Sequence, residues 1–382
     1  MRRVLLRILK TLALSLLLTL CVALAVAWHG LGQQASGERL ARMRKSPQWH
    51  NGGFENPQPL INDAWLSVTG AFHASDFGRP QPDVQLPDID PKPLQTLPKS
   101  GLRVTWLGHS TSLIEMEGVR ILTDPVWSHR VSPIGNVGPT RFYPPQIGLG
   151  DLPDIDAVLI SHDHYDHLDA PTIEAMKMWK NSFIVPLGVG AHLAYWGIDP
   201  TRIIELDWWE STQLGAVTVH CTPARHASGR FVTDKDKTLW AGFALVGKNK
   251  RLFFSGDTGL FPGMSEIGKR FGPFDLAMIE VGQYDRAWPD WHIGPEQAVV
   301  AAKMLRGRAL LPMHWGLFKL AYHSWTEPVE RVLLAANAHQ VPVLTPQPGE
   351  SIEATAQAPR KNWWPTAAWQ TSAEHPVVSS GM

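Results

Sequence analysis

The sequence predicts an α/β domain preceded by a hydrophobic N-terminal helix, and three observations favour this class. Short apolar runs with strand-like patterns recur from residue 102 onward, with helix-like stretches between and after them. A cluster of histidines and aspartates follows one of these runs directly, where α/β proteins place their chemistry. Residues 11–28 carry no charge, which indicates a membrane-directed helix.

Composition limits the possible partners. The chain has 382 residues, of which 44% are hydrophobic and 18% charged, so it can bury a large core. Its formal net charge is +0, and a neutral chain without a basic block argues against a nucleic-acid partner held by phosphate contacts. Cys21 lies in the N-terminal apolar run and Cys221 deep in the chain, so we expect no internal disulfide.

Residues 1–28 predict a signal anchor or a signal peptide. Four basic residues precede an apolar segment that just reaches the roughly 18–20 residues needed to span a bilayer. Cleavage after Ala25-Val26-Ala27 and lipidation of Cys21 are the alternatives, although Leu20 is large for a lipidation site. Because the basic end stays in the cytoplasm, we expect a membrane-anchored protein with its catalytic domain on the periplasmic side, or a secreted one after cleavage.

Residues 29–97 predict an N-terminal arm that packs on the domain, with one helix near residues 37–45. Proline, glycine and asparagine indicate turns, whereas Trp49, Phe54, Trp65 and Phe72 favour packing over a free linker. The tail, residues 353–382, is rich in alanine, proline, threonine and serine, and we expect it to be loose.

Residues 98–352 form the predicted hydrolase domain. Its first strands make a hairpin around Glu117-Gly118. The helix that begins at Ala170 has Asp169 as a plausible N-cap and Pro171 in its first turn. The predicted strands are 102–107, 112–116, 119–123, 155–160, 183–186, 202–206, 216–222, 239–246, 251–255, 276–281, 309–312 and 341–344, and the later helices are 294–305 and 327–338.

The stretch from residue 161 to 169, SHDHYDHLD, carries the strongest chemical signal. His162, His164, Asp166 and His167 form an H-x-H-x-D-H pattern on a loop after a strand. Imidazole and carboxylate ligands suit borderline divalent ions such as zinc. The spacing allows the ligands to be divided between two metal ions. A solvated polar loop with chance histidines would not explain this pattern.

Three further residues complete a two-metal site. His226, Asp257 and His314 each follow an apolar strand, although singly each is equally consistent with an ordinary histidine or a turn aspartate. Together they leave an open position for solvent or substrate. We predict two Zn²⁺ ions, or other divalent metals, one held by His162, His164 and His226, the other by Asp166, His167 and His314, with Asp257 bridging them.

The pattern resembles the metallo-β-lactamase superfamily and, within it, the N-acyl-phosphatidylethanolamine-hydrolysing phospholipase D family. The resemblance covers about residues 46–350. It is carried by VTWLGH at 104–109, LTDP at 122–125, ELDWWE at 205–210, IGKRFGPFDLA at 267–277 and HWG at 314–316.

This resemblance implies an αββα sandwich, two zinc ions, and hydrolysis of a phosphodiester lipid to an N-acylethanolamine and phosphatidic acid. It implies work at a membrane through a hydrophobic surface beside the metal cleft. The chain departs from the family at residues 11–28. A lactonase or another hydrolase acting on a small soluble substrate is the alternative. A strict β-lactamase is disfavoured because Cys221 is not in the matching ligand position, and a binding module without turnover because no ligand is missing.

The predicted mechanism is attack on phosphorus by a metal-bridging hydroxide, because two ions lower the pKa of a shared water. Asp166 and Asp257 are expected to orient it. The leaving alkoxide needs a proton, for which His292 and His323 are the candidates, although either is as readily a pocket-lining histidine.

Other residues are expected to support or line the site. Asp124 is predicted to accept a hydrogen bond from a ligand histidine. His109 is either a similar support or a satisfied core histidine. Four apolar residues are equally consistent with an acyl groove and with core packing: Trp288, Trp291, Phe318 and Leu320.

Overall fold

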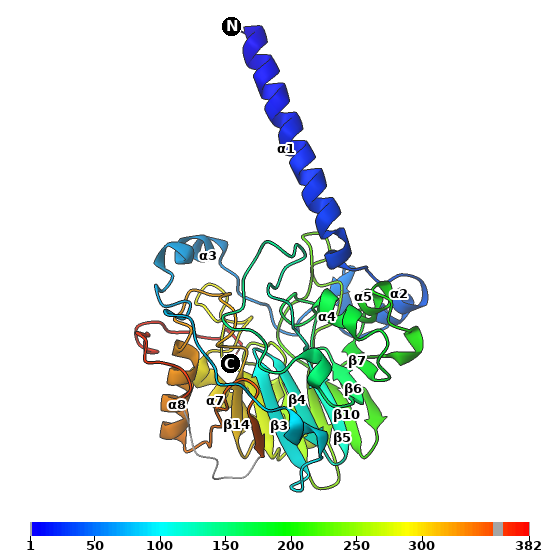
Figure 1. Ribbon diagram of the computed structural model, residues 1–382, viewed down its shortest axis with the longest axis vertical. Coiled ribbons are helices and arrows are strands. Elements are labelled where there is room, and N and C mark those ends of the chain that lie inside the picture. The colour runs from blue at the N-terminus through cyan, green and yellow to red at the C-terminus, as the bar shows by residue number, and fades with distance from the viewer. Residues whose placement is uncertain (1, 354–361, 382) are drawn as a thin grey trace.

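Two β-sheets pack face to face and carry helices on their outer surfaces in the computed structural model, which describes residues 2–353 and 362–381 (Figure 1). The predicted α/β class and αββα sandwich are therefore confirmed. In the first sheet the strand order is β15-β3-β4-β5-β6-β7-β8. Its strands are β3 (Leu102–Gly108), β4 (Thr111–Met116), β5 (Val119–Thr123), β6 (Ala157–Leu159), β7 (Ser182–Pro186), β8 (Ile203–Leu206) and β15 (Ser351–Glu353).

The second sheet has the strand order β14-β13-β12-β11-β10-β9. Its strands are β9 (Ser211–Leu214), β10 (Val217–Thr222), β11 (Gly242–Val246), β12 (Arg251–Phe254), β13 (Leu276–Glu280) and β14 (Leu310–Met313). Each sheet begins as an antiparallel meander and continues with parallel strands. The parallel strands all end at one edge, so the loops that follow them meet there.

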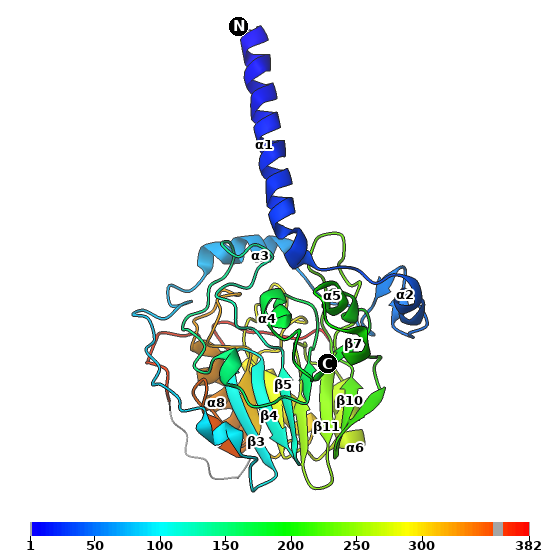
Figure 2. The ribbon, with the colours of Figure 1, turned by 45° about the vertical axis from the view of Figure 1, so that its right-hand side comes forward.

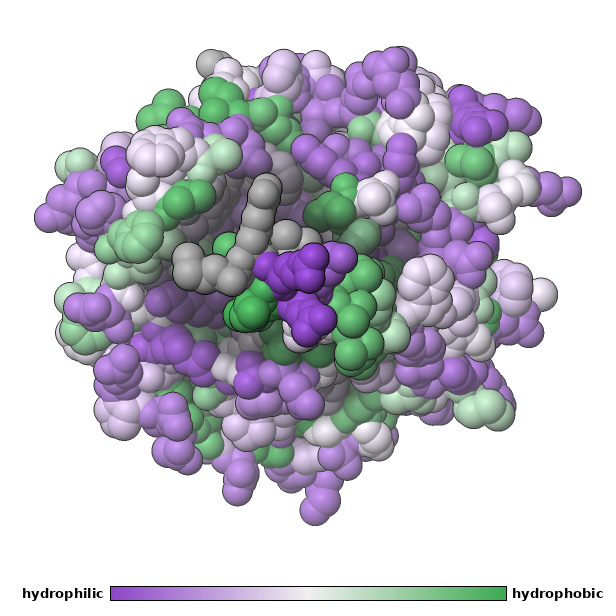
Figure 3. Space-filling view, turned by 90° about the horizontal axis from the view of Figure 1, so that it is seen from above, coloured by the Kyte–Doolittle hydropathy of each residue, from purple (hydrophilic) through white to green (hydrophobic). Residues whose placement is uncertain are grey.

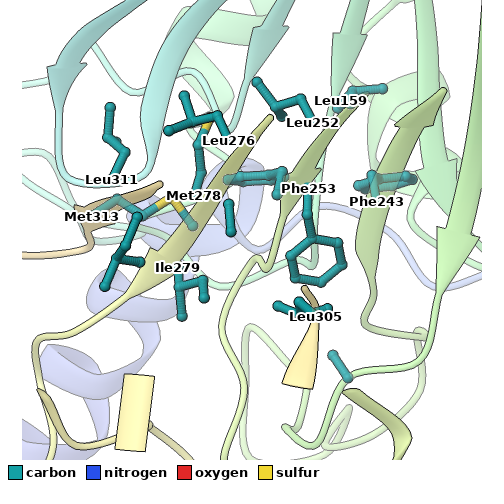
Figure 4. Close-up of a cluster of buried hydrophobic side chains, with 14 of the residues drawn as sticks. Leu159, Phe243, Leu252, Phe253, Leu276, Met278, Ile279, Leu305, Leu311 and Met313 are labelled. Carbon is teal, nitrogen blue, oxygen red and sulfur yellow. The ribbon is translucent and has the colours of Figure 1, made fainter. Parts of the chain in front are cut away.

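The hydrophobic core lies between the sheets and beneath the helices. Every residue of β13 is buried, because helix α7 packs against the outer face of that strand and the other sheet covers the inner face. Figure 4 shows this core, with side chains from both sheets and from the end of α7: Leu159, Phe243, Leu252, Phe253, Leu276, Met278, Ile279, Leu305, Leu311 and Met313. The helices of the domain are α4 (Ala170–Ala175), α5 (Gly190–Tyr195), α6 (Gly263–Phe271), α7 (Pro295–Met304) and α8 (Glu327–His339).

Helix α1 (Arg2–Leu31) rises from the domain as a single rod (Figures 1 and 2). Within it, Arg3–Leu31 is long and apolar enough to cross a membrane. At 1.5 Å per residue its length is about 45 Å, more than the roughly 30 Å hydrocarbon core of a bilayer. Such a helix is compatible with an anchor and with a signal sequence.

The N-terminal arm contains short elements: α2 (Gly37–Met43), β1 (Trp49–His50), β2 (Gly53–Phe54), α3 (Ala64–Gly70) and the 3₁₀ turns η1 (Ala71–His73) and η2 (Lys92–Gln95). Phe54 is buried, and its N–H donates to the Asp236 carbonyl oxygen at 2.8 Å. Trp65 and Phe72 differ from the expected packing, because their side chains are 73% and 84% exposed. Trp65 lies on the two-turn helix α3 and Phe72 on the 3₁₀ turn η1 that follows it.

The tail differs from the predicted loose segment. Residues 354–361 lie outside the described residues, but residues 362–381 pack on the domain. The indole N–H of Trp364 donates to Glu330 Oε1 at 2.8 Å, and the Trp363 ring packs 5.3 Å from the Trp315 ring. Trp364 is buried and Trp363 half-buried, so both contribute apolar contacts that hold this segment on the domain. The strand predicted at 341–344 is also wrong, since only a single bridge joins Leu310 to Val343.

His375 fastens this tail to the domain. Its Nε2 lies 3.3 Å from Asp285 Oδ2 and its Nδ1 lies 3.5 Å from Glu327 Oε1. The hydrogen bonds to Asp285 and Glu327 raise the pKa of His375 to about 9.

We predict that the stability contributed by His375 is full below about pH 6.5 and is lost as the pH rises through about 9, because the charged form is favoured in the folded state. After allowance for solvent screening, the loss is about 1–2 kcal/mol. Urea unfolding of the wild type and His375→Gln across this range should give free energies that converge at high pH. His339→Gln, at the exposed end of α8, is the control, and a constant gap between wild type and His375→Gln would contradict the prediction.

Candidate metal centre

The structure brings the seven predicted ligands into one cluster at the ends of β6, β10, β12 and β14. In the first group, His162 Nε2 lies 2.8 Å and His226 Nε2 lies 3.3 Å from His164 Nδ1. Two ligands with metal bonds of about 2.1 Å at a tetrahedral ion lie roughly 3.4 Å apart. The three nitrogens are therefore spaced as ligands of one ion.

The second group contains Asp166, His167 and His314. His167 Nε2 lies 3.3 Å from Asp166 Oδ2, and His314 Nε2 lies 3.9 Å from the same oxygen. Asp257 lies between the groups, because its Oδ2 is 3.1 Å from His167 Nε2 and 3.8 Å from His162 Nε2. This position matches the bridging carboxylate that the sequence predicts.

Neighbouring groups fix the orientation of the rings. The Nδ1–H of His167 donates to Asp124 Oδ2 at 2.7 Å, and the Ser161 N–H and hydroxyl also donate to the Asp124 carboxylate. The Nδ1–H of His226 donates to the Trp291 carbonyl oxygen at 2.8 Å. These bonds leave Nε2 of His167 and of His226 as the nitrogen that could bind a metal, an arrangement typical of metal-binding histidines.

His109 also belongs to the cluster. Its Nε2 lies 2.8 Å from Asp166 Oδ2, so the buried ring orients that carboxylate. Its backbone is left-handed, with φ of 53°, as are the backbones of Asp124 (34°) and His314 (64°). Such backbone conformations are uncommon outside glycine and persist where the surroundings enforce them.

Three buried polar atoms, each without a hydrogen-bond partner in the described part of the chain, indicate whether a metal fits this cluster. His167 Nε2, His314 Nε2 and Asp257 Oδ1 have no hydrogen-bond partner among the described residues. Leaving a buried polar atom unsatisfied costs about 1–3 kcal/mol. A cation among them would satisfy all three, and the mixed imidazole and carboxylate donors suit a divalent transition metal. The cluster therefore fits a divalent metal.

The electrostatics also favour ligation. Burial, followed by repulsion from neighbouring histidines, lowers the pKa values of His162, His226 and His314 well below the ordinary value. Burial lowers the pKa of His164 to about 4. These rings are therefore neutral at physiological pH, the form that binds metal. Burial, aided by Glu280 and opposed by His167, raises the pKa of Asp257 to about 7, so this carboxylate is costly to ionise without a cation beside it.

The two predicted proton donors lie in different surroundings. His292 lines the metal pocket, and its Nδ1 lies 2.8 Å from Glu280 Oε2. His323 is absent from the lining. Its Nε2 accepts the Gln283 N–H at 2.9 Å, and its Nδ1–H donates to the Ser324 carbonyl oxygen. Both nitrogens of His323 are occupied by backbone groups, so of the two predicted donors His292 alone remains a candidate.

Sequence reasoning missed Glu280, which is fully buried at the end of β13. The available signal was a single carboxylate inside the apolar run LAMIEV at 276–281. A buried charge is rarely left without a partner. Here the partners are His292 and the Thr258 N–H.

The pocket over the cluster has a volume of about 320 Å³. Trp288, Trp291 and Leu320 line it, whereas Phe318 is buried edge-on against the His109 ring at 5.2 Å. The N-terminal arm contributes Ser67, whose carbonyl oxygen accepts the Tyr322 hydroxyl at 2.6 Å.

Ser67 belongs to α3, and the same helix exposes apolar side chains. Trp65 and Val68 are 73% and 60% exposed, and Phe72 follows in η1. Helices α1 and α3 lie on the same side of the domain (Figures 1 and 2). Figure 3 looks onto this side and shows hydrophobic patches among the polar residues. The helix that contributes Ser67 to the metal pocket thus also exposes apolar side chains, and we call the exposed residues Trp65, Val68 and Phe72 the apolar rim.

Comparison with known proteins supports this reading. A family model described as the beta-lactamase superfamily domain matches residues 119–315, which contain all seven cluster residues. An uncharacterized protein of Mycobacterium tuberculosis is 44% identical over 350 residues, covering 88% of this chain and 93% of that protein. The N-acyl-phosphatidylethanolamine-hydrolyzing phospholipase D 1 of Caenorhabditis elegans is 40% identical over 234 residues, covering 58% of this chain and 66% of that protein. A metallo hydrolase structure from Ignicoccus hospitalis aligns with a TM-score of 0.53 at 25% identity, covering 66% of this chain and 97% of that one.

Proposed function

The chain belongs to the metallo-β-lactamase superfamily and is a metal-dependent hydrolase, and on this basis we propose that it is a zinc-dependent phosphodiesterase of the phospholipase D type. Its proposed substrates are N-acyl-phosphatidylethanolamine-like lipids, and its products are an N-acylethanolamine and phosphatidic acid. We further propose that α1 stays attached as a membrane anchor, with the catalytic domain on the periplasmic side.

One observation carries the lipid assignment: the metal pocket is lined in part by the helix that exposes Trp65 and Val68. Large apolar side chains rarely gather on the surface of a soluble protein unless they contact a partner or a membrane. Helix α1 emerges on the same side, so a bilayer that α1 crosses would face this rim. Similarity to the nematode phospholipase D supports the same substrate class.

In the proposed mechanism the metals and the side chains of the protein have separate roles. Two zinc ions held by the seven residues would lower the pKa of a bound water and neutralise charge on the phosphate. The chain itself supplies orientation, through the Asp166 and Asp257 carboxylates. Burial raises the pKa of Glu280 well above its usual value, so its protonated carboxyl donates to His292 Nδ1; the neutral ring then carries its proton on Nε2, from which it can pass to the leaving alkoxide oxygen. Glu280 holds the ring in that orientation.

We expect His292→Gln to lower kcat on an alkyl phosphodiester by about 10²–10³-fold, because the alkoxide then leaves without a proton donor. A nitrophenyl phosphodiester has a stable leaving group, so its hydrolysis should fall much less. His220→Gln, on β10 beside Phe271 and outside the cluster, is the matched control. Equal losses on both substrates would contradict a proton-donor role.

The deciding experiment uses the zinc-loaded full chain and vesicles containing N-acyl-phosphatidylethanolamine, with products identified by mass. We expect phosphatidic acid and N-acylethanolamine, both absent with His162→Ala. Replacing Trp65 and Phe72 together by serine should lower the rate on vesicles by about tenfold or more and leave a short-chain soluble phosphodiester unaffected. No lipid product from a protein that binds two zinc ions would refute the lipid assignment and favour a lactone or another small soluble substrate.

A further inference from the structure

The last turn of α1 and the residues after it, which we call the helix foot (residues 27–33), are held by side chains of the domain. The indole N–H of Trp196 donates to the His29 carbonyl oxygen at 2.9 Å. Arg230 donates to the Gly30 carbonyl oxygen from Nε at 3.2 Å and from Nη2 at 2.7 Å. The His29 carbonyl oxygen also accepts the Gly32 N–H at 3.2 Å. The last carbonyls of a helix lack partners within the helix, and an arginine at this end complements the helix dipole.

Arg230 also holds the metal loop, residues 162–168. Its Nη1 donates to the carbonyl oxygens of Asp163 and Leu168 at 2.7 and 2.9 Å, on either side of the ligands from 164 to 167. Its guanidinium carbon lies 4.2 Å from the centre of the Tyr165 ring, between two of those ligands. Arg230 is only 4% exposed, so one buried cation connects the helix foot to the loop.

A second connection runs through His192. The Gln33 N–H donates to His192 Nδ1 at 3.0 Å, so the ring carries its proton on Nε2. His192 Nε2 lies 3.3 Å from Asp163 Oδ2, and the same carboxylate accepts the Gly229 N–H and the Thr238 hydroxyl. Asp163 separates His162 from His164 in the sequence. The helix foot is thus linked to the loop twice, through Arg230 and through His192.

We propose that the helix foot is a positioning element for the metal site: its docking through Arg230 and His192 holds the metal loop in its ligating conformation. If the foot leaves, the buried guanidinium and His192 each lose a partner, and the loop is free to rearrange. Because coupling between sites is reciprocal, metal binding in turn holds the foot in place. The proposal depends on the metal site of the proposed function and not on its substrate.

Two glycines give a matched test. Gly32 and Gly37 both have positive φ, 74° and 56°. An added Cβ at Gly32 would lie 2.2 Å from His192 Nδ1, whereas at Gly37 it would have no heavy atom within 4 Å. Gly32→Ala should therefore dislodge the foot, while Gly37→Ala adds the same backbone strain without the clash.

We expect the full-length Gly32→Ala protein in detergent to release Zn²⁺ to a chromophoric chelator about tenfold faster than the wild type, and Gly37→Ala within about twofold of it. The visible bands of the Co²⁺-loaded protein, which report ligand geometry, should shift in Gly32→Ala alone. Equal release rates and unchanged bands in both variants would overturn the proposal. The wild-type zinc content, measured first, separates this result from failure of the metal site itself.

Hydrogen exchange on the wild type avoids any mutation. Removing zinc with a chelator should speed amide exchange in the peptide containing Gly32 and Gln33, and leave α8 unchanged. If exchange rises in the metal loop but not in the helix foot, the two are uncoupled and the proposal is wrong.

Discussion

Replacing Asp257 with asparagine is expected to lower kcat/KM by roughly 10³-fold and to reduce the bound zinc from two ions per chain to one or fewer. Asp257 Oδ2 lies within 3.8 Å of His162 Nε2 and 3.1 Å of His167 Nε2, one from each ligand group. An amide at this position keeps the size of the side chain but removes the negative charge shared by two cations. Both ions should therefore bind more weakly, and substrate hydrolysis should fall with them.

Zinc content by elemental analysis and steady-state kinetics would measure this effect. Asp199→Asn is the control, because Asp199 caps a short surface turn through the Thr201 N–H, far from the cluster. An Asp257→Asn protein with two firmly held zinc ions and near-normal kcat/KM would show that this carboxylate does not bridge the metals.

Arg331→Met is expected to lower the free energy of unfolding by about 3–5 kcal/mol, because it removes one partner from a buried ionic network. The Arg331 guanidinium donates to both carboxylate oxygens of Glu296 at 2.9 and 2.8 Å, and to Glu327 Oε1 at 3.2 Å. Glu327 is almost fully buried and also accepts the Tyr284 hydroxyl. Without Arg331, the Glu327 carboxylate loses the more deeply buried of its two cationic neighbours and keeps His375.

Urea unfolding of the two proteins would measure this difference. Arg308→Met is the matched control, since Arg308 pairs with Asp275 but its side chain is 67% exposed, so the loss should stay below about 1 kcal/mol. Adding Glu327→Gln to Arg331→Met should restore part of the stability. Equal losses for the Arg331 and Arg308 variants would mean that burial adds nothing to this pair.

The sequence was sufficient to predict those site residues that directly follow a recognisable strand. Four of the seven cluster residues come from a single loop, and His226, Asp257 and His314 each follow a recognisable strand. Parallel strands end at one edge of a sheet, so residues that follow them converge whatever the loops between them do. The strand pattern predicted the α/β class, whereas the αββα architecture was implied by the family resemblance.

The rest depends on contacts that the sequence does not display. His292 and His323 are equivalent in sequence context, yet one lies against the Glu280 carboxylate and the other between two backbone groups. Trp65 and Trp364 are equally apolar, yet the first is exposed and the second buried. Which histidine faces the pocket and which tryptophan is buried depend on the packing of segments that are distant in the sequence. Residue type and hydrophobic periodicity therefore could not distinguish these residues.

The left-handed backbones of His109, Asp124 and His314 are a local cost that the contacts of their buried side chains offset. Each such residue costs on the order of 1 kcal/mol or more, which a glycine would recover. Glycine at any of these positions would, however, remove a fully buried side chain and leave its partners unpaired, such as the Ser161 hydroxyl and His167 beside Asp124, at about 1–3 kcal/mol for each group. Engineering of this protein for robustness should hold these positions constant and seek its gains at exposed sites, where substitutions are usually neutral.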